Sequence, residues 1–185
     1  MFNEKDLVSK ILAGDLHAFG RLVTGYEKLV FNIVNRVIDH PEDVEDVCQE
    51  VFIKVYKGLR GFAFQSKLST WIASIAHRTA LNELKKNGRK VWMAPMEEPV
   101  HLLSGGDDPE KTVIRKDVSL YIQQLIDQMP SQYSLVITLF HIHEFSYQEI
   151  EEITGMPLGT VKGYLFRARK LLKEKLECFL KKETI

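Results

Sequence analysis

The sequence predicts an all-α protein with two helical domains joined by a flexible acidic linker. Apolar residues recur at helical spacing along most of the 185 residues, and no segment shows the strict alternation that is typical of a strand. Between about 88 and 109 this pattern fails, because prolines and glycines are mixed with several acidic residues. We therefore predict domains at 1–90 and 111–185 with a linker at 91–110.

The first three helices are predicted from caps and breakers. A short amphipathic segment at 3–13 ends at Gly14, and Asp15 is expected to cap a longer helix with a continuous apolar stripe. That helix ends before Pro41, because proline pushes the preceding residue out of the α region. Pro41 suits the first position of the next helix, which we predict over 41–59.

This third helix carries its acidic residues mainly in the first two turns. From Asp39 to Glu50 there are six acidic residues and no basic one. Acidic side chains near a helix start stabilise the helix dipole, and composition alone favours this interpretation of Asp43 and Asp46. The alternative is an anionic surface that includes Gln49 and docks on a basic protein partner.

A loop with two phenylalanines follows at 58–67. Loop aromatics usually fill a core, but next to the polar residues 65–67 they also suit stacking on an unpaired base. Ser69 or Thr70 is expected to cap the next helix, which turns apolar residues inward. Its outward side is polar and basic, with His77, Arg78, Asn82, Lys85, Lys86 and Arg89.

The C-terminal domain is expected to end in a helix-turn-helix at 146–175. Pro130 stops the preceding helix, and Ser131 is expected to cap another one. Within 146–175, Ser146 and Glu149 form a capping box, and Gly155 provides the left-handed residue that ends a helix.

The second helix of this pair starts near Gly159–Thr160 and is strongly basic on one face. Such a helix either lies in the major groove of DNA or forms the solvated side of an ordinary bundle. The capping, the turn and the basic face together favour DNA binding. The basic residues are Lys162, Arg167, Arg169, Lys170 and Lys173.

Composition excludes some classes of protein and leaves DNA binding open. The formal charge is zero, but acidic residues gather at 39–50 and basic ones at 77–90, and surfaces act locally within a Debye length of roughly 8–10 Å. We expect no signal peptide and no membrane span, since no apolar run approaches ~20 residues. The sequence also has no Gly-rich phosphate loop and no nucleophile–His pair, so an enzyme is not expected.

Cysteine and histidine usage predicts no disulfide framework and no metal site. Cys48 and Cys178 are far apart in the sequence, and a reducing cytosol is the default compartment. His141 and His143 are two residues apart, so on a helix their side chains point to different sides. No metal and no cofactor are therefore expected.

The chain resembles the extracytoplasmic-function group of bacterial sigma factors over nearly its whole length. The resemblance is carried by DVEDVCQEVFIKVY at 43–56, by KLSTWIASIAHRTALNELKK at 67–86 and by MPSQYSLVITLFHIHEFSYQEIEEITGMPLGTVKGYLFRARKLL at 129–172. Three motifs in this order, joined by an aperiodic acidic segment, are far more specific than any one of them.

The resemblance implies a cytoplasmic factor that directs core RNA polymerase to promoters, reads the −35 element and melts the −10 element. The residues that it implies for binding the clamp helices of the largest polymerase subunit are Asp43, Asp46, Gln49 and Glu50. Those implied for −10 DNA are Phe64, Gln65, Ser66, Lys67, Ser69, Thr70, Trp71, His77, Arg78, Asn82, Lys85 and Lys86. Those implied for −35 DNA are Thr160, Lys162, Gly163, Tyr164, Arg167, Arg169 and Lys170. The implied partners are core polymerase, promoter DNA and an anti-sigma factor, with no membrane insertion.

The chain departs from the family pattern at a few of these positions. His77-Arg78 stands where Arg-Asn is frequent, and Lys85-Lys86 replaces an arginine pair, which keeps the charge but loses the bidentate fork. Gly163-Tyr164 stands where Ser-Arg is frequent, so an aromatic contact is expected in place of a basic one. Glu151 occupies a position that is usually alanine, which bears on how closely the two helices pack.

The residues leave two functions from different classes to be distinguished. One is a promoter-specificity subunit that works only with core polymerase, and the other is a stand-alone helix-turn-helix regulator whose N-terminal domain senses a ligand or dimerises. The acidic patch at 39–50 followed by the aromatic loop favours the first, because a regulator has no need of both.

Overall fold

The computed structural model describes residues 4–38, 40–86 and 118–183, and within these it gives only the helical backbone of 118–119 and 178–183. The described residues form helices and their connections, with no strand among them, which confirms the predicted all-α class. The predicted linker at 91–110 lies outside the described residues.

The N-terminal domain contains α1 (Glu4–Leu12), α2 (Leu16–Asn35), α3 (Pro41–Gly58), the 3₁₀ turn η1 (Leu59–Gly61) and α4 (Leu68–Lys86). The helix break predicted at Gly14, the cap predicted at Asp15 and the helix start predicted at Pro41 are confirmed. Gly14 has a φ of 95°, Asp15 Oδ1 accepts a hydrogen bond from the Ala18 N–H at 3.0 Å, and Pro41 is the first residue of α3.

The predicted cap of α4 was wrong. The helix begins at Leu68, so Ser69 and Thr70 lie in its first turn, and the Lys67 carbonyl accepts from the Trp71 N–H at 3.1 Å. The reason is tertiary: Leu68 and Thr70 are both fully buried, and packing starts the helix before the polar residues that resemble caps.

The domain core lies between α2, α3 and α4, which contact one another, while α1 packs on α2. Its fully buried side chains include Leu22, Val30, Ile33, Val51, Val55, Leu68 and Ile72. Burying one such side chain contributes about 1.5–3 kcal/mol relative to leaving it in water.

The C-terminal domain contains α5 (Val118–Asp127), α6 (Ser131–Ile137), the π-helical turn η2 (Thr138–Ile142), α7 (Tyr147–Thr154) and α8 (Leu158–Glu183). The capping box of α7 is confirmed, as is Gly155 in the left-handed conformation with a φ of 72°. Ser131 is the first helical residue and Pro130 the cap, contrary to the prediction, and α8 begins at Leu158.

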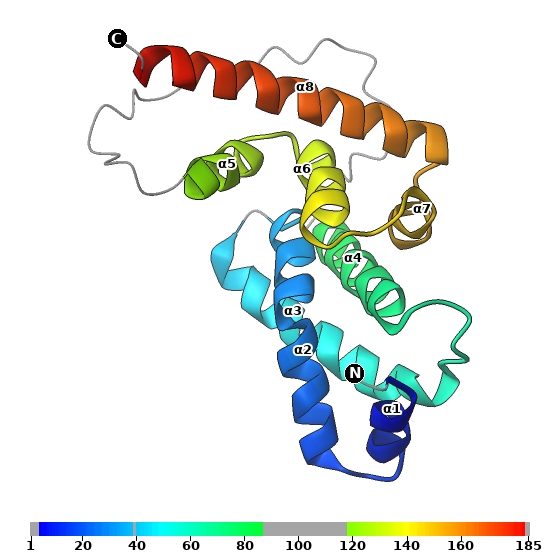
Figure 1. Ribbon diagram of the computed structural model, residues 1–185. Helices are drawn as coiled ribbons and strands as arrows, with labels where there is room; N and C mark the ends of the chain where they lie inside the picture. Colours follow the sequence, from blue (N-terminus) through cyan, green and yellow to red (C-terminus); the bar gives the residue numbers. More distant parts are fainter. Residues whose placement is uncertain (1–3, 39, 87–117, 184–185) are drawn as a thin grey trace.

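The two domains are in contact through α4 and α7 (Figure 1), and buried side chains of both domains belong to one hydrophobic cluster. In Figure 1 the long helix α8 lies at the end of the molecule away from α1, and α4 lies between the other N-terminal helices and α7. This contact decides which of the predicted DNA-binding residues are exposed.

Candidate polymerase and DNA interfaces

The acidic face of α3 is largely exposed. Asp46, Gln49 and Glu50 are exposed and Asp43 is half-buried, while the Glu50 carboxylate pairs with Lys54 at 2.8 Å one turn later. Ile53 is also exposed. The helix therefore presents acidic and apolar side chains together, while Glu42 and Asp43 still lie in the first turn, where they favour the dipole.

The phenylalanines of the 58–67 loop form an aromatic cluster with Trp71. The ring centroids of Phe62 and Phe64 are 4.6 Å apart, and those of Phe62 and Trp71 are 4.9 Å apart. Phe62 is buried, whereas Phe64 is exposed and has a φ of 55°, which is uncommon for a bulky residue. The loop thus combines the two alternatives of the sequence analysis: Phe62 fills the core, and Phe64 faces solvent.

The α4 helix separates the predicted −10 residues into an open and a covered group. The open group is exposed to solvent and consists of Gln65, Lys67, Arg78, Asn82, Lys85 and Lys86, with Ser66, Ser69 and Trp71 half-buried. The covered group is Thr70 and His77, which lie beneath the second domain with exposed fractions of 0% and 4%. The sequence pattern placed His77 on the outer side, and it is covered because α7 packs there.

The His77 ring is uncharged at neutral pH in this environment. Burial lowers the pKa of His77 from its ordinary value near 6.5 to about 4, against a hydrogen bond with the Ile153 backbone that raises it; the nearby Arg78 charge lowers it further. His77 therefore serves as a neutral contact between α4 and α7 in the arrangement seen here.

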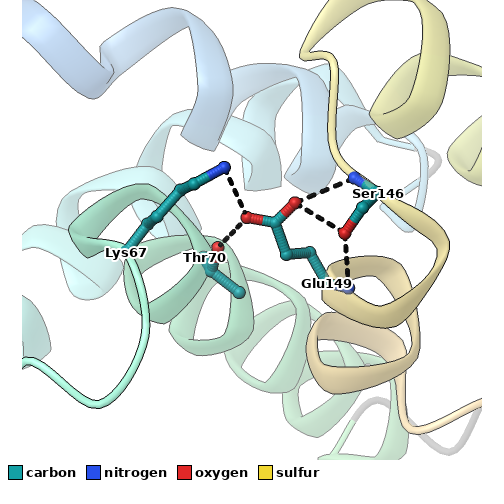
Figure 2. A network of polar contacts seen from close by, with 4 residues as sticks. All are labelled: Lys67, Thr70, Ser146 and Glu149. Atoms are coloured by element: carbon teal, nitrogen blue, oxygen red, sulfur yellow. Dashed lines mark hydrogen bonds and ion pairs between the residues drawn. The ribbon is translucent and has the colours of Figure 1, made fainter.

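The Glu149 carboxylate lies on the same boundary and receives donors from both domains (Figure 2). One oxygen accepts from Lys67 Nζ at 3.0 Å and from Thr70 Oγ1 at 3.2 Å. The other accepts from the Ser146 backbone N–H and from Ser146 Oγ, each at 2.8 Å. The sequence indicated the Ser146 half of this network, but nothing in it pointed to Lys67 and Thr70.

Two further polar contacts join the domains. The Arg36 guanidinium at the end of α2, only 6% exposed, donates to the Asp127 carboxylate at the end of α5. Asn32 Nδ2 donates to His143 Nε2 at 3.1 Å. Neither contact was predicted, because each joins residues about a hundred positions apart in helices that show no local sign of pairing.

The basic face predicted on α8 is present. Lys162, Arg167, Arg169 and Lys170 are exposed, and Thr160 and Gly163 are half-buried. Tyr164 is different, since it is 7% exposed and its ring centroid lies 5.2 Å from that of Tyr133 in the domain core. Its burial argues against the predicted aromatic contact with DNA, and among the α8 side chains that the structure describes Phe166 is an exposed aromatic one.

Two of these cations rest on a stacked pair of aromatic rings. Lys162 Nζ is 5.8 Å from the ring centroid of Tyr147, and the Arg169 guanidinium carbon is 4.9 Å from that of Phe140. The two rings stack on each other with centroids 5.1 Å apart. Since 162 and 169 are two helical turns apart, the rings hold two cations on one side of α8.

His141 also holds the Arg169 side chain in place. Arg169 Nε donates to His141 Nε2 at 3.0 Å, which requires that nitrogen of His141 to be unprotonated. Burial and the Arg169 charge both lower the pKa of His141. His141 and His143 point to different partners, and the described residues contain no group of three metal-ligating side chains.

Glu151 also has a role that the sequence did not indicate. Its carboxylate accepts a hydrogen bond from the Leu158 N–H at 3.0 Å, at the first residue of α8. An acidic side chain here satisfies a free helix donor and favours the helix dipole, so the residue that departs from the family pattern joins the two helices.

Two family models match this chain. The model described as Sigma-70 region 2 matches residues 22–90, and the model described as Sigma-70, region 4 matches residues 119–172. Together they include the acidic helix, the aromatic loop, α4 and the helix-turn-helix. Among the described helices none is long and apolar enough to cross a membrane.

Curated relatives align over almost the whole chain. The RNA polymerase sigma-H factor of Pseudomonas aeruginosa is 31% identical over 185 residues, with 96% of each chain covered. The ECF RNA polymerase sigma-E factor of Escherichia coli is 33% identical over 183 residues, with 95% of each chain covered.

Solved structures share the fold at low identity. The sigma factor RpoE of Bartonella quintana, in a co-crystal with the anti-sigma factor NepR, superposes with a TM-score of 0.61 at 19% identity, covering 86% of this chain and 96% of that one. CnrH, in complex with the cytosolic domain of CnrY, gives a TM-score of 0.58 at 19% identity, covering 93% and 96%.

Proposed function

This chain belongs to the extracytoplasmic-function group of sigma factors, which initiate transcription at specific promoters. We propose that three of its surfaces bind the polymerase, the −10 element and the −35 element. The acidic face of α3 binds core RNA polymerase. The aromatic loop and α4 open and hold the −10 element, and α8 reads the −35 element.

The observation that carries this assignment is the difference in charge between two helices, since α3 exposes acidic side chains and α8 exposes basic ones. The described N-terminal domain exposes Asp46, Gln49 and Glu50 beside apolar residues, a composition that suits a basic protein surface. The C-terminal domain exposes cations on one helix of a helix-turn-helix, which suits the phosphates that flank a major groove.

The −10 assignment is supported by the arrangement of the loop before α4. Phe64 is an exposed ring at the edge of an aromatic cluster, and Arg78, Lys85 and Lys86 lie exposed along the helix that follows. Extruding a base costs a few kcal/mol of stacking, which aromatic stacking and phosphate contacts must repay.

The chain acts by binding and has no catalytic step of its own, and its place of action is the cytoplasm, where core polymerase is found. The domain bounds 1–90 and 111–185 remain part of this proposal. An anti-sigma protein is a further proposed partner, because this chain shares its fold with the sigma factor RpoE, which was solved in complex with an anti-sigma factor. A stand-alone regulator is disfavoured, since region 2 of the family occupies the place of a sensing domain.

The polymerase contact is tested by reversing two charges on α3. Asp43→Lys with Asp46→Lys should abolish co-purification with core polymerase while leaving thermal unfolding close to that of the wild type. The matched control is Asp6→Lys with Glu27→Lys, which reverses two exposed acidic charges of the same domain outside α3. Equal loss in both double variants, or retained binding in the first, would contradict the docking face.

A further inference from the structure

At the start of α4, a carboxylate from the other domain contacts residues of the proposed DNA-binding surface. Glu149 is held by four donors, two from α4 and its cap and two from Ser146 (Figure 2). Both donors on the α4 side, Lys67 and Thr70, belong to the proposed −10 surface.

Lys67 and Thr70 offer the chemistry that holds a phosphate. An ammonium and a hydroxyl are two of the groups that most often bond phosphate oxygens in protein–DNA complexes. Here they converge on a single anionic oxygen, at 3.0 Å and 3.2 Å. A carboxylate resembles a phosphodiester in presenting two oxygens that share one negative charge, so the observed ligand indicates what else the pair can hold.

We propose that Lys67 and Thr70 form a phosphodiester site at the start of α4, and that Glu149 occupies this site in the free chain as an internal substitute for DNA. The inference rests on the proposed function, because it takes the ligand to be a backbone phosphate of the −10 strand. It adds that the closed domains and the DNA strand compete for the same two side chains.

The contact between the two domains also covers or fixes other parts of their boundary. Thr70 and His77 are buried beneath α7, and the contacts of Arg36 with Asp127 and of Asn32 with His143 hold the domains together further along the boundary. A strand that contacts Thr70 and His77 as well as Lys67 must therefore displace α7.

The competing contact is weak enough to be displaced. The Lys67 side chain is 70% exposed and that of Glu149 is 17% exposed, so solvent and salt screen the ion pair from the lysine side and limit its contribution. Glu149 also keeps its partners on α7 when the domains separate, because the Ser146 hydrogen bonds are made within its own helix. Opening thus frees Lys67 and Thr70 without uncapping α7.

The charge of Glu149 supports its role as a phosphate substitute. Burial acts to raise its pKa, but the Ser146 backbone N–H, Lys67 and the Ser146 hydroxyl outweigh it and lower the pKa of Glu149 to about 2. The group is therefore an anion at every pH at which the protein would meet DNA.

The test compares two variants of the full chain that each remove one negative charge from α7. Glu149→Gln removes the charge facing Lys67, while glutamine still serves in a capping box. Glu152→Gln is the matched control, because Glu152 is exposed on the same helix. The probe is a fluorescein-labelled oligothymidylate of about twelve nucleotides, within the usual length of a single-strand site, and binding is followed by anisotropy at low salt.

We expect Glu149→Gln to bind the oligothymidylate at least about three-fold more tightly than Glu152→Gln, as removing a surface ion pair allows. Equal affinities of the two variants would overturn the proposal, since net charge would then explain any gain. Circular dichroism confirms that both remain folded.

A second variant distinguishes two explanations for tighter binding, which are a phosphate site at Lys67 and the mere separation of the domains. Lys67→Gln breaks the same ion pair from the other side, so both variants should open the domains more readily, seen as a larger radius of gyration in small-angle X-ray scattering. Lys67→Gln should nevertheless bind the oligothymidylate more weakly than the wild type, because the phosphate donor is lost. Tighter binding by Lys67→Gln would overturn the site. Neither result depends on polymerase, so failure here is distinct from failure to co-purify with core polymerase.

Discussion

His77 lies at the boundary between the domains, and its burial there makes the stability of the protein depend on pH. Its ring is buried between α4 and α7, with the pKa lowered to about 4 by burial. Between pH 6.5 and 4 the unfolded chain therefore binds a proton that the folded chain does not. The stability that the neutral His77 ring contributes is therefore present in full above the ordinary pKa of histidine, and it is lost as the pH drops toward 4.

We predict that lowering the pH from 7 to 5 costs about 2 kcal/mol of unfolding free energy through His77 alone. Urea denaturation at the two pH values measures the loss. Because His141 and His143 also have lowered pKa values, the informative comparison is with His77→Gln, in which the loss should shrink by about the same 2 kcal/mol. An identical pH dependence in the variant would show that His77 does not titrate in this way.

Gly58 allows the indole of Trp71 to approach the end of α3. A Cβ atom placed on Gly58 would lie 3.1 Å from Trp71 Cζ2, which belongs to a rigid ring. We predict that Gly58→Ala lowers the free energy of unfolding by about 1–3 kcal/mol through overpacking, measured by urea denaturation. Gly61→Ala is the control, because a Cβ there meets nothing within 4 Å, and it should have a much smaller effect.

Among single residues, the sequence predicted what is local and missed what is tertiary. The Ser146–Glu149 capping box follows from two residues three positions apart. The second half of the Glu149 network joins it to Lys67 and Thr70, about eighty positions away, and no sequence pattern carries that information. For the same reason Tyr164 was expected on the surface but lies against Tyr133.

Among the helices, α8 has the arrangement expected of a DNA-binding element, and aromatic rings hold two of its cationic side chains in place. Lys162 and Arg169 are each supported by a ring, Tyr147 and Phe140, and these rings come from other segments of the same domain. Side chains held in this way lose less conformational entropy when they bind a phosphate than free ones do.

We predict that Lys162→Gln weakens binding of the chain to its −35 duplex and reduces the salt slope of log K by about 0.9, the value for one lost phosphate contact. Titration over a range of salt concentrations measures the slope. Lys175→Gln, which changes an exposed cation about three and a half turns further along α8, should leave the slope nearly unchanged. A slope that Lys162→Gln does not alter would remove this residue from the DNA backbone.

Helix boundaries could be predicted where a residue dictates the backbone, and not elsewhere. Gly14, Asp15, Pro41 and Gly155 each act through their own conformation or hydrogen bond, and the structure agrees at all four. The start of α4 is set by burial of Leu68 instead. The π-helical turn at Thr138–Ile142 has no such local signal, and it places Phe140 and His141 beside Arg169.

For the molecule as a whole, the decisive feature is that the two domains touch. Periodicity and caps predicted both domains, but not the face that each turns to the other, because that choice depends on contacts between α2 or α4 and the C-terminal helices. Lys67 and His77 were accordingly assigned to DNA without regard to α7, which covers the second and pairs with the first.

The contact between Arg36 and Asp127 tests this closure. Arg36 is buried and Asp127 is about half exposed, so Asp127→Asn leaves a guanidinium without its charge partner at the boundary. We predict that the domains separate more readily, seen as a larger radius of gyration in small-angle X-ray scattering. Gln123→Ala, which removes a different hydrogen-bond partner of Asp127, should stay close to the wild type. An unchanged radius for Asp127→Asn would mean that this pair does not hold the domains together.

Transcription reconstituted from purified parts decides whether the two domains act together as described. The chain is mixed with core RNA polymerase and genomic DNA, and the 5′ ends of the transcripts are mapped. Start sites absent from core polymerase alone should share two sequence elements at a fixed spacing upstream, and they should disappear with the Asp43→Lys, Asp46→Lys variant. Transcripts no different from those of core polymerase alone would contradict a role in promoter selection.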